Sequence, residues 1–411
     1  MGRNKIVYAG ETLIDLTADT VTAETLAEGV TAHGADGEKI VGTMKGGGSA
    51  VSVPPKDVNF WDYDGTCLYS YTLAEAQALT ALPPLPEREG LICQGWNWTL
   101  AEVKAMDRRT DVGAMYITDD GTTRLYITIE SDVALTIPLH FYQAAANNVE
   151  IDWGDGTAVE TVAGTGFIST SHTYAAIGDY VIRIKVKSGT AFALGSTTAS
   201  TTVLGALAAA NTAIRKVLRK VEFGTCNGWL YNNTFYNCYK LESVTLPKSI
   251  VRINSSIFTN CINLKCAIVP SSVVSFVGNG IWYGCTTTPI FSLPGNFTTL
   301  SGTSFQNCNG YDTVVLPSGV TNIGTREFYL AYPSHLIFPP ALKTINAEAF
   351  YGCYCCQIYD FTRCTQVPTL ANTNAFSGIH SDAKILVPAA LADEWKAATN
   401  WATYASYIVG V

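Results

Sequence analysis

The chain has 411 residues, too many for one ordinary compact core, and this length predicts two to four modules. Apolar residues make up 47% and charged residues only 15%, a balance that favours buried β-structure with many turns over a helical enzyme. The net charge of −8, without any basic cluster, argues against nucleic acid as a partner. The sequence shows neither a secretory signal nor a stretch as long as a transmembrane helix, so we expect synthesis in the cytosol and no membrane insertion.

The first predicted module spans residues 1–44 and is followed by a Gly-rich linker at 45–50. We expect a strand at Ile6–Tyr8, a short helix from a Thr22 cap to Gly29, and a hairpin turn at Asp36-Gly37. The runs at 10–26 and 37–44 resemble the N-terminal module of tail-fibre and other minor structural proteins of phages and prophages that infect Firmicutes. The resemblance implies attachment to other virion proteins. Because about 44 residues bury little core, this module is expected to oligomerise, and fibre proteins of this kind favour a homotrimer.

Residues 51–122 predict a small α+β unit. Capping boxes at 72–75 and 99–102, each a Thr followed three residues later by Glu, predict two short helices. Strands are expected at Val58–Trp61, Leu91–Gln94 and Ala114–Thr118.

The segment D-Y-D-G-T at 62–66 resembles a motif of haloacid-dehalogenase phosphatases. The resemblance implies that one of Asp62 and Asp64 attacks phosphorus while the other acts as acid and base, with Mg²⁺ bridging the carboxylates and Asp119-Asp120 as the later acidic motif. That fold needs a doubly wound parallel sheet, which this short segment cannot supply. Asp-Gly also forms ordinary hairpin turns, so we expect a turn here and no enzyme.

Residues 123–190 predict an antiparallel β-sandwich, because Asp-Gly turns separate runs that alternate with period two. W-G-D-G at 153–156, H-T-Y at 172–174 and G-D-Y-V-I at 178–182 resemble the polycystic-kidney-disease (PKD) type of immunoglobulin-like domain. The resemblance implies a spacer or an adhesive module. We expect His172 to pack in a turn rather than to act as a base. A connector follows at 191–211.

Residues 212–390 carry a repeat of about 23 residues, which predicts a solenoid. Aromatic residues recur at Phe235, Phe258, Trp282, Phe305, Phe328 and Phe350, at steps of 23, 24, 23, 23 and 22. Three residues later comes cysteine, at Cys238, Cys261, Cys285, Cys308 and Cys353, with Ala331 in the remaining repeat. Twelve residues after most of the aromatics comes proline, at Pro247, Pro270, Pro294, Pro317 and Pro340.

Each proline is preceded by a β-branched run that predicts a short strand, such as 243–246 and 313–316. Stacking such units forms a parallel sheet beside an internal column of aromatic and cysteine side chains. Asn or Gly directly before the cysteines predicts a tight corner, at Asn237, Asn260, Asn307, Gly284 and Gly352. The amphipathic segment 391–411 is expected to cap the open end with a helix.

F-x-N-C-x-x-L-x-x-V-x-L-P at 235–247 resembles the BspA-type leucine-rich repeat, a class common in surface proteins of gut bacteria and in their phages. The resemblance covers about 215–411 and implies a binding scaffold. The fold class is therefore expected to be multidomain and mainly β, with a small N-terminal module, an α+β unit, an immunoglobulin-like sandwich and a C-terminal solenoid.

The twelve cysteines are expected to be buried, reduced thiols. Cys353, Cys355 and Cys356 lie too close together for the paired spacing that a zinc site needs, and Cys364 is their only near neighbour. We therefore expect no metal and no cofactor.

Tyrosines of the repeats are the expected ligand contacts, because they offer rigid, amphipathic surface. The candidates are Tyr236, Tyr239, Tyr283, Tyr329, Tyr332, Tyr351 and Tyr354, with Trp229, Tyr231 and Tyr311 as further possibilities. Tyrosine follows the core aromatic directly at 236, 283, 329 and 351, so those four are expected to share one face of the stack. The alternative is that they only cover the flank of the solenoid.

The sequence is compatible with three functions. The first is a phage or prophage tail fibre, or another receptor-binding appendage of the virion, which binds a glycan or protein on the host surface. The alternative is a bacterial surface or secreted adhesin that binds host protein or glycan, which would need an export signal or a wall anchor. The third is an Mg²⁺-dependent phosphatase acting through Asp62 and Asp64.

Overall fold

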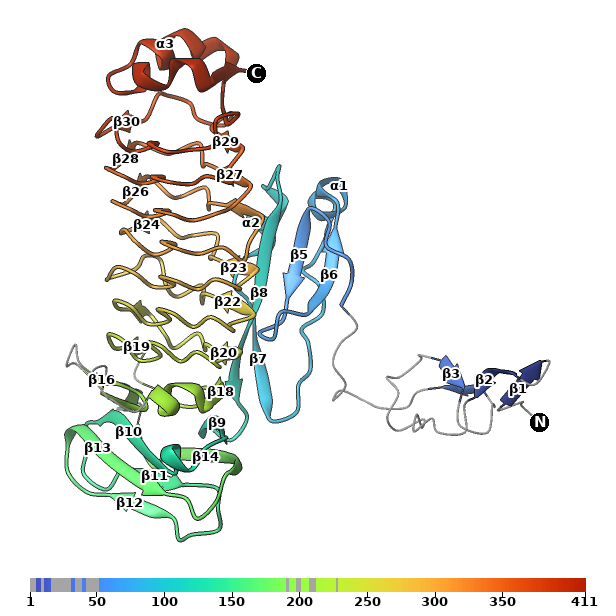
Figure 1. Ribbon diagram of the computed structural model, residues 1–411, viewed down its shortest axis with the longest axis vertical. Coiled ribbons are helices and arrows are strands. Elements are labelled where there is room, and N and C mark those ends of the chain that lie inside the picture. The colour runs from blue at the N-terminus through green and yellow to red at the C-terminus, as the bar shows by residue number, and fades with distance from the viewer. Residues whose placement is uncertain are drawn as a thin grey trace.

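The computed structural model describes residues 52–189, 192–196, 201–206, 212–226 and 228–411, together with four short strands nearer the N-terminus (Figure 1). Strand β1 (Lys5–Tyr8) pairs antiparallel with β2 (Glu11–Asp15), and β3 (Thr31–His33) pairs antiparallel with β4 (Lys39–Val41). The predicted strand at Ile6–Tyr8 is confirmed. The predicted helix at 22–29, the turn residues at 36–37 and the linker at 45–50 lie outside the described residues.

The predicted α+β unit contains a four-stranded sheet in the order β6-β5-β8-β7. Its elements are β5 (Val58–Trp61), β6 (Cys67–Tyr71), α1 (Leu73–Gln77), β7 (Leu91–Trp96), α2 (Leu100–Lys104) and β8 (Thr110–Thr118). Both capping boxes are formed, since Thr72 and Thr99 accept from the backbone N–H of the Glu three residues on. Strand β6 was not predicted, and its pairing with β5 follows from the tight turn at 62–66.

Residues 123–194 form two antiparallel sheets. In one, β10 (Thr136–Gln143) lies between β13 (Gly166–Thr173) and β15 (Phe192–Leu194). The other contains β9 (Thr123–Ile129), β11 (Val149–Asp152), β12 (Glu160–Val162) and β14 (Gly178–Val186). Alternate residues of β9 and β10 enter one shared apolar core, so the predicted antiparallel strands with period-two burial are confirmed. A 3₁₀ turn (Asp132–Ala134) joins β9 to β10, and β16 (Thr201–Thr202) pairs with β17 (Gly205–Ala206).

The C-terminal half is a β-solenoid of about eight turns (Figure 1). Three-residue strands predominate on one side, which we call the strand face: β18 (Leu218–Glu222), β20 (Ser243–Thr245), β22 (Cys266–Ile268), β23 (Ile290–Ser292), β25 (Thr313–Val315), β27 (His335–Ile337), β29 (Ile358–Asp360) and β31 (Lys384–Val387). Two-residue strands form a second side: β19 (Trp229–Leu230), β21 (Arg252–Ile253), β24 (Thr299–Leu300), β26 (Asn322–Ile323), β28 (Thr344–Ile345) and β30 (Thr369–Leu370). The pairings between turns are parallel, as the repeat predicts.

Each turn of the solenoid is stacked on the next through its aromatic and cysteine residues. Phe305 and Phe328 are stacked with ring centroids 5.0 Å apart, and Phe235 and Phe258 with centroids 5.4 Å apart. The thiol of Cys308 donates to the carbonyl of Trp282 at 2.9 Å, one turn back. The same bond joins Cys261 to Phe235, Cys285 to Phe258 and Cys353 to Phe328. Burial raises the pKa of the Cys238 and Cys285 thiols to about 12, so these thiols stay protonated and can donate.

The residue before each of these cysteines turns the chain in the left-handed backbone region. Asn237, Asn260 and Asn307 have φ of 57° to 59°, and Gly284 and Gly352 have φ of 72° and 69°. The predicted corner is confirmed, because Asn and Gly tolerate this conformation best. Leu330 takes the position in the turn without cysteine, with φ of 51°.

Both ends of the solenoid are covered. At the N-terminal end, β18 pairs with β20 and also with β9, so a sheet of the sandwich continues into the solenoid. A 3₁₀ turn (Thr212–Lys216) precedes β18. At the C-terminal end come a 3₁₀ turn (Ala389–Leu391), α3 (Ala392–Ala397), a second 3₁₀ turn (Trp401–Tyr407) and β32 (Ile408–Gly410), which pairs with β31. The predicted helix is thus confirmed. In the described part of the chain, no helix combines the length and apolar character needed to cross a membrane.

Candidate functional site

The predicted tyrosines occupy two columns along the solenoid, one and four residues after each core aromatic. We call this surface the turn face. Tyr236, Tyr283 and Tyr329 are half-buried, as are Tyr239 and Tyr332, whereas Tyr351 is 36% and Tyr354 is 53% exposed. None of the seven is buried in the core. Tyr231 and Tyr311 are buried, at 8% and 4% exposure, so these two further candidates were wrong.

The structure brings four of the predicted tyrosines together. Tyr329 and Tyr351 are stacked with ring centroids 5.1 Å apart and planes 8° apart, and Tyr332 and Tyr354 have centroids 6.4 Å apart and planes 25° apart. We call these four residues the tyrosine cluster. The guanidinium of Arg326 lies 5.4 Å from the centre of the Tyr329 ring and is ion-paired with Glu348.

The remaining predicted tyrosines lie apart from the cluster. Buried Thr259 and half-buried Gln306 interrupt the first column, so Tyr236 and Tyr283 are not continuous with Tyr329. Tyr283 accepts a hydrogen bond from the side chain of Asn307 at 3.1 Å. Of the four tyrosines predicted to share one face, only Tyr329 and Tyr351 are therefore stacked, and Tyr236 and Tyr283 stand singly.

The strand face is covered by the α+β unit, which lies alongside the solenoid with β8 next to β20, β22 and β23 (Figure 1). Buried Asn97 joins the two: its amide donates to the carbonyl oxygens of Val269 and Ser292 at 2.9 and 3.2 Å. Its carbonyl accepts from the backbone N–H of Gly113 at 2.8 Å, within the unit. The neighbouring Trp98 donates from its indole to Leu293 at 2.8 Å.

Apolar contacts and ion pairs complete this interface. Trp61 and Cys67 of the unit share a buried cluster with Cys266, Ile268 and Ile290 of the solenoid. A Cβ atom on Gly113 would lie 2.4 Å from Ile268, so only glycine fits at this approach. Further along, Arg108 is ion-paired with Asp360 and donates to Thr362 at 2.6 Å. The cover therefore extends from β20 to β29.

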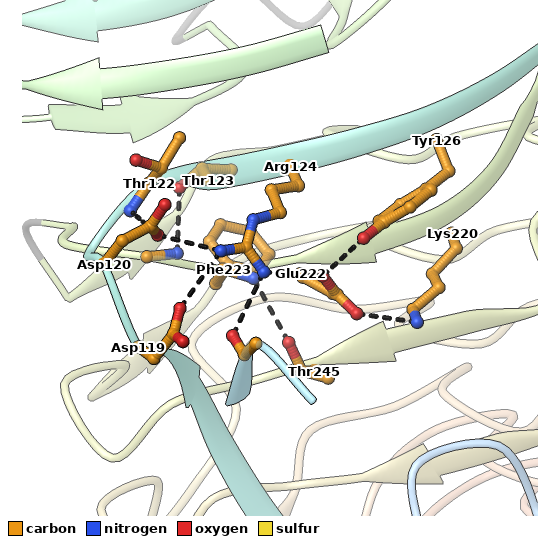
Figure 2. Close-up of polar contacts among 12 residues, drawn as sticks. Asp119, Asp120, Thr122, Thr123, Arg124, Tyr126, Lys220, Glu222, Phe223 and Thr245 are labelled. Atoms are coloured by element: carbon orange, nitrogen blue, oxygen red, sulfur yellow. Dashed lines mark hydrogen bonds and ion pairs between the residues drawn. The ribbon is translucent and has the colours of Figure 1, made fainter. Parts of the chain in front are cut away.

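Three parts of the chain meet at Glu222, which is 3% exposed (Figure 2). Its carboxylate accepts from Lys220 at 2.6 Å, from the Tyr126 hydroxyl at 2.8 Å and from Arg124 at 3.4 Å. Arg124 of β9 also donates to the carbonyl of Gly90 in the α+β unit and pairs with Asp119 and Asp120 at 3.1 and 3.0 Å (Figure 2). We call this network the junction, because it fixes the unit, the two-sheet module and the solenoid to one another.

The phosphatase-like segment forms the predicted turn. Asp62 and Thr66 are hydrogen-bonded across it, and Gly65 has φ of 86°. The Asp62 carboxyl is fully buried, which raises its pKa, and Arg88 lies 2.5 Å from it. Asp64 accepts from the backbone N–H of Thr66 at 2.9 Å. Among the described residues, no group of three or more His, Cys, Asp or Glu could hold a metal ion.

His172 lies in β13 and packs against the turn at 153–157, as predicted. Its ring is stacked on Trp153 with centroids 5.0 Å apart, and its Nε2 lies 2.7 Å from the Asp155 carboxylate. Hydrogen bonds from Thr157, together with the one from His172, lower the pKa of Asp155 to about 2. All twelve cysteines are free thiols, and ten of them are buried.

Sequence reasoning did not find the interface residues Asn97, Arg108 and Glu222. The one local signal is the run W-N-W at 96–98, a polar residue between two large aromatics at the end of a predicted strand. Nothing in that run identifies a partner nearly 200 residues away.

The fold and its two contrasting faces define a repeat solenoid with one face covered by the chain itself. Residues 229–357 match the family model described as the BspA type leucine rich repeat region, in six copies. The predicted repeat class is thus confirmed, and this part of the chain is a BspA-type leucine-rich-repeat region. No curated protein matches the chain.

Two solved structures are similar to part of the chain. One is a leucine rich cell surface protein from Faecalibacterium prausnitzii, 18% identical, with a TM-score of 0.23, covering 40% of this chain and 71% of its own. The other is a leucine-rich repeat protein from Bacteroides ovatus, 16% identical, with a TM-score of 0.23, covering 42% of this chain and 58% of its own.

Proposed function

We propose that the chain is a binding protein without catalytic activity, and that it presents the turn face of its solenoid to a ligand on a cell surface. The main support for this proposal is the contrast between the covered strand face and the open turn face. Repeat solenoids offer an extended surface for partners. Here the strand face is occupied by Asn97, Trp98 and the rest of the α+β unit, whereas Tyr351 and Tyr354 of the tyrosine cluster are exposed to solvent.

We further propose that the chain is a receptor-binding appendage of a phage or prophage virion, attached through residues 1–44. The likeness of that segment to phage tail-fibre modules supports this role. The PKD-like sandwich at 123–190 then serves as a rigid connector, since Arg124 and its sheet continue into the solenoid. The second candidate is a bacterial surface adhesin, which the BspA-type repeat region favours.

Purification of particles separates the two roles. Prophages of the source bacterium are induced and banded on a density gradient, and surface proteins of uninduced cells are released by brief protease treatment. Mass spectrometry then quantifies this chain in both fractions. The account predicts that it co-purifies with tail proteins at a fixed ratio. Recovery only from the cell surface would establish the adhesin instead, and recovery from neither fraction would contradict both.

The absence of catalysis is tested separately. The buried Asp62 carboxyl is held by Arg88, so it is poorly placed to attack a phosphate in solution. We expect no Mg²⁺-dependent hydrolysis of p-nitrophenyl phosphate above the level of Asp62→Asn. Hydrolysis by the unchanged chain that Asp62→Asn abolishes would contradict this proposal.

A further inference from the structure

The two tyrosine columns end at the same level of the solenoid. After Tyr351 and Tyr354, the next turn has Ser377 and His380 at the equivalent positions of the two columns, and Gly378 lies beside Tyr354. A Cβ atom on Gly378 would lie 3.5 Å from Cε1 of Tyr354, so any larger residue there would pack against this ring. Tyr351 and Tyr354 are accordingly more exposed than Tyr329 and Tyr332.

The other faces of these two rings are supported from below. Tyr329 stacks under Tyr351 with planes 8° apart, and Tyr332 lies under Tyr354. Arg326 continues the first stack beneath Tyr329. Because the rings are held in place before a ligand arrives, binding would cost little side-chain entropy.

Polar groups border the exposed rings. Glu348 is ion-paired with Arg326 and accepts from the Asn374 amide at 3.4 Å. Asn374, Glu348 and Arg326 each lie two residues before a core aromatic of successive turns. They form a row of hydrogen-bonding groups next to the column that contains Tyr351.

The size of this surface indicates its ligand. With about 200 Å² for a whole aromatic side chain, the exposed fractions of Tyr351 and Tyr354 amount to roughly 200 Å² together. A stable protein interface needs about 800 Å² on each partner, with an apolar centre. Two ring faces bordered by carboxylate and amide groups instead suit one or two sugar rings, which present C–H groups on their faces and hydroxyls at their edges.

We infer that Tyr351 and Tyr354 form a stacking platform for pyranose units of a surface polysaccharide, with Glu348 and Asn374 bonding the sugar hydroxyls. This inference rests on the proposed function and names the ligand class of its turn face.

The test uses the full chain on a printed array of purified bacterial and mucosal polysaccharides. The wild-type chain is expected to bind a subset of them. Tyr351→Ala/Tyr354→Ala should weaken that binding by at least about tenfold, which corresponds to about 1.4 kcal/mol. Tyr351→Phe/Tyr354→Phe keeps the ring faces and should stay within about threefold of wild type. Ile262→Ala is the matched control, because Ile262 is exposed in the same column as Tyr354 but lies four turns earlier.

Two results would overturn the platform. One is the absence of any polysaccharide signal that depends on the two tyrosines. The other is equal loss in the alanine and phenylalanine pairs, which would show that the ring faces are not what binds. Circular dichroism and thermal melting of each variant exclude unfolding as the cause.

Binding to intact bacterial cells separates this inference from the proposed function. Cell binding that needs Tyr351 and Tyr354 and is lost after periodate treatment of the cells supports both. Tyrosine-dependent binding that survives periodate but is lost after protease treatment would overturn the sugar platform and leave the proposed function in place. Cell binding that does not depend on the turn face would overturn both.

Discussion

The strand face and the turn face arise from the same repeat but differ in what covers them. On the strand face, backbone carbonyls of Val269 and Ser292 bond Asn97, a side chain from outside the solenoid. On the turn face, two pairs of tyrosines stack on one another, and the outer ring of each pair is exposed to solvent. Substitutions on the covered strand face should therefore reduce stability, whereas substitutions on the open turn face should reduce ligand binding.

The largest loss of stability is expected at the junction. Glu222→Ala removes the buried carboxylate that Lys220, Tyr126 and Arg124 share, and so leaves two cations without their common partner (Figure 2). We expect the free energy of unfolding to fall by about 4 kcal/mol. Denaturant titration measures it.

The matched control is Glu242→Ala, since Glu242 forms an exposed ion pair with Lys265. Its cost should stay below about 1 kcal/mol. Equal effects of the two substitutions would show that the junction contributes no more than an ordinary surface pair.

Asn97→Ala is expected to lower the free energy of unfolding somewhat less than Glu222→Ala does. It leaves the Gly113 N–H and the carbonyls of Val269 and Ser292 without the bonds that Asn97 supplies in a buried interface. A loss of about 3 kcal/mol follows from that desolvation, together with faster hydrogen exchange in β8. Exposed Asn296 donates to Ser271 at 3.1 Å, and Asn296→Ala should change stability by less than about 0.5 kcal/mol. Unchanged exchange in β8 after Asn97→Ala would contradict the proposed cover.

One of the residues directly before a core aromatic is an acid, Glu327, which precedes Phe328. Glu327 is fully buried. Burial raises its pKa from 4.5 to about 7. Between these values the folded state binds more protons than the unfolded state. The contribution of Glu327 to the free energy of unfolding is therefore complete below pH 4.5 and is lost as the pH rises to 7.

The free energy of unfolding should fall by about 3 kcal/mol between pH 4.5 and pH 7. Unfolding free energies at pH 4.5 and 7 should therefore differ less in Glu327→Gln than in the wild-type chain. Parallel pH profiles for the two would contradict this origin of the pH dependence.

A small gain is expected where a corner residue departs from the repeat. Leu330 adopts φ of 51° at a position that Asn or Gly occupies in neighbouring turns. Leu330→Asn should raise the unfolding free energy by about 1 kcal/mol, because left-handed backbone is less strained for Asn. Leu330→Ala retains the strain and should give no gain. A melting temperature for Leu330→Asn at or below that of Leu330→Ala would contradict this reading of the corner.

The repeat could be predicted in detail because its physics is local. Phe305, Cys308 and Pro317 recur with their counterparts at a fixed spacing, and the contacts of Phe305 and Cys308 lie within their own turn or with an adjacent turn. The two capping boxes are equally local, and both are formed. Elements fixed by near neighbours in the chain are therefore those that the sequence predicts best.

The docking of the α+β unit could not be predicted, because its contacts join residues nearly 200 positions apart. Asn97 has no repeated counterpart, and its partners are backbone carbonyls, which carry no sequence signature. The candidate site was predicted in part. The period places the tyrosines in columns, but the stacking of Tyr351 on Tyr329 and the exposure of Tyr354 depend on how successive turns overlap.

Binding of the labelled full chain to intact bacterial cells, measured by flow cytometry, shows whether the turn face is the surface that meets the ligand. Wild type, Tyr351→Ala/Tyr354→Ala and Ile262→Ala are compared at equal concentration after each is shown to be folded. The double variant is expected to lose cell binding, whereas Ile262→Ala should retain it. Wild-type binding by the double variant would contradict the assignment of the turn face as the surface that meets the ligand.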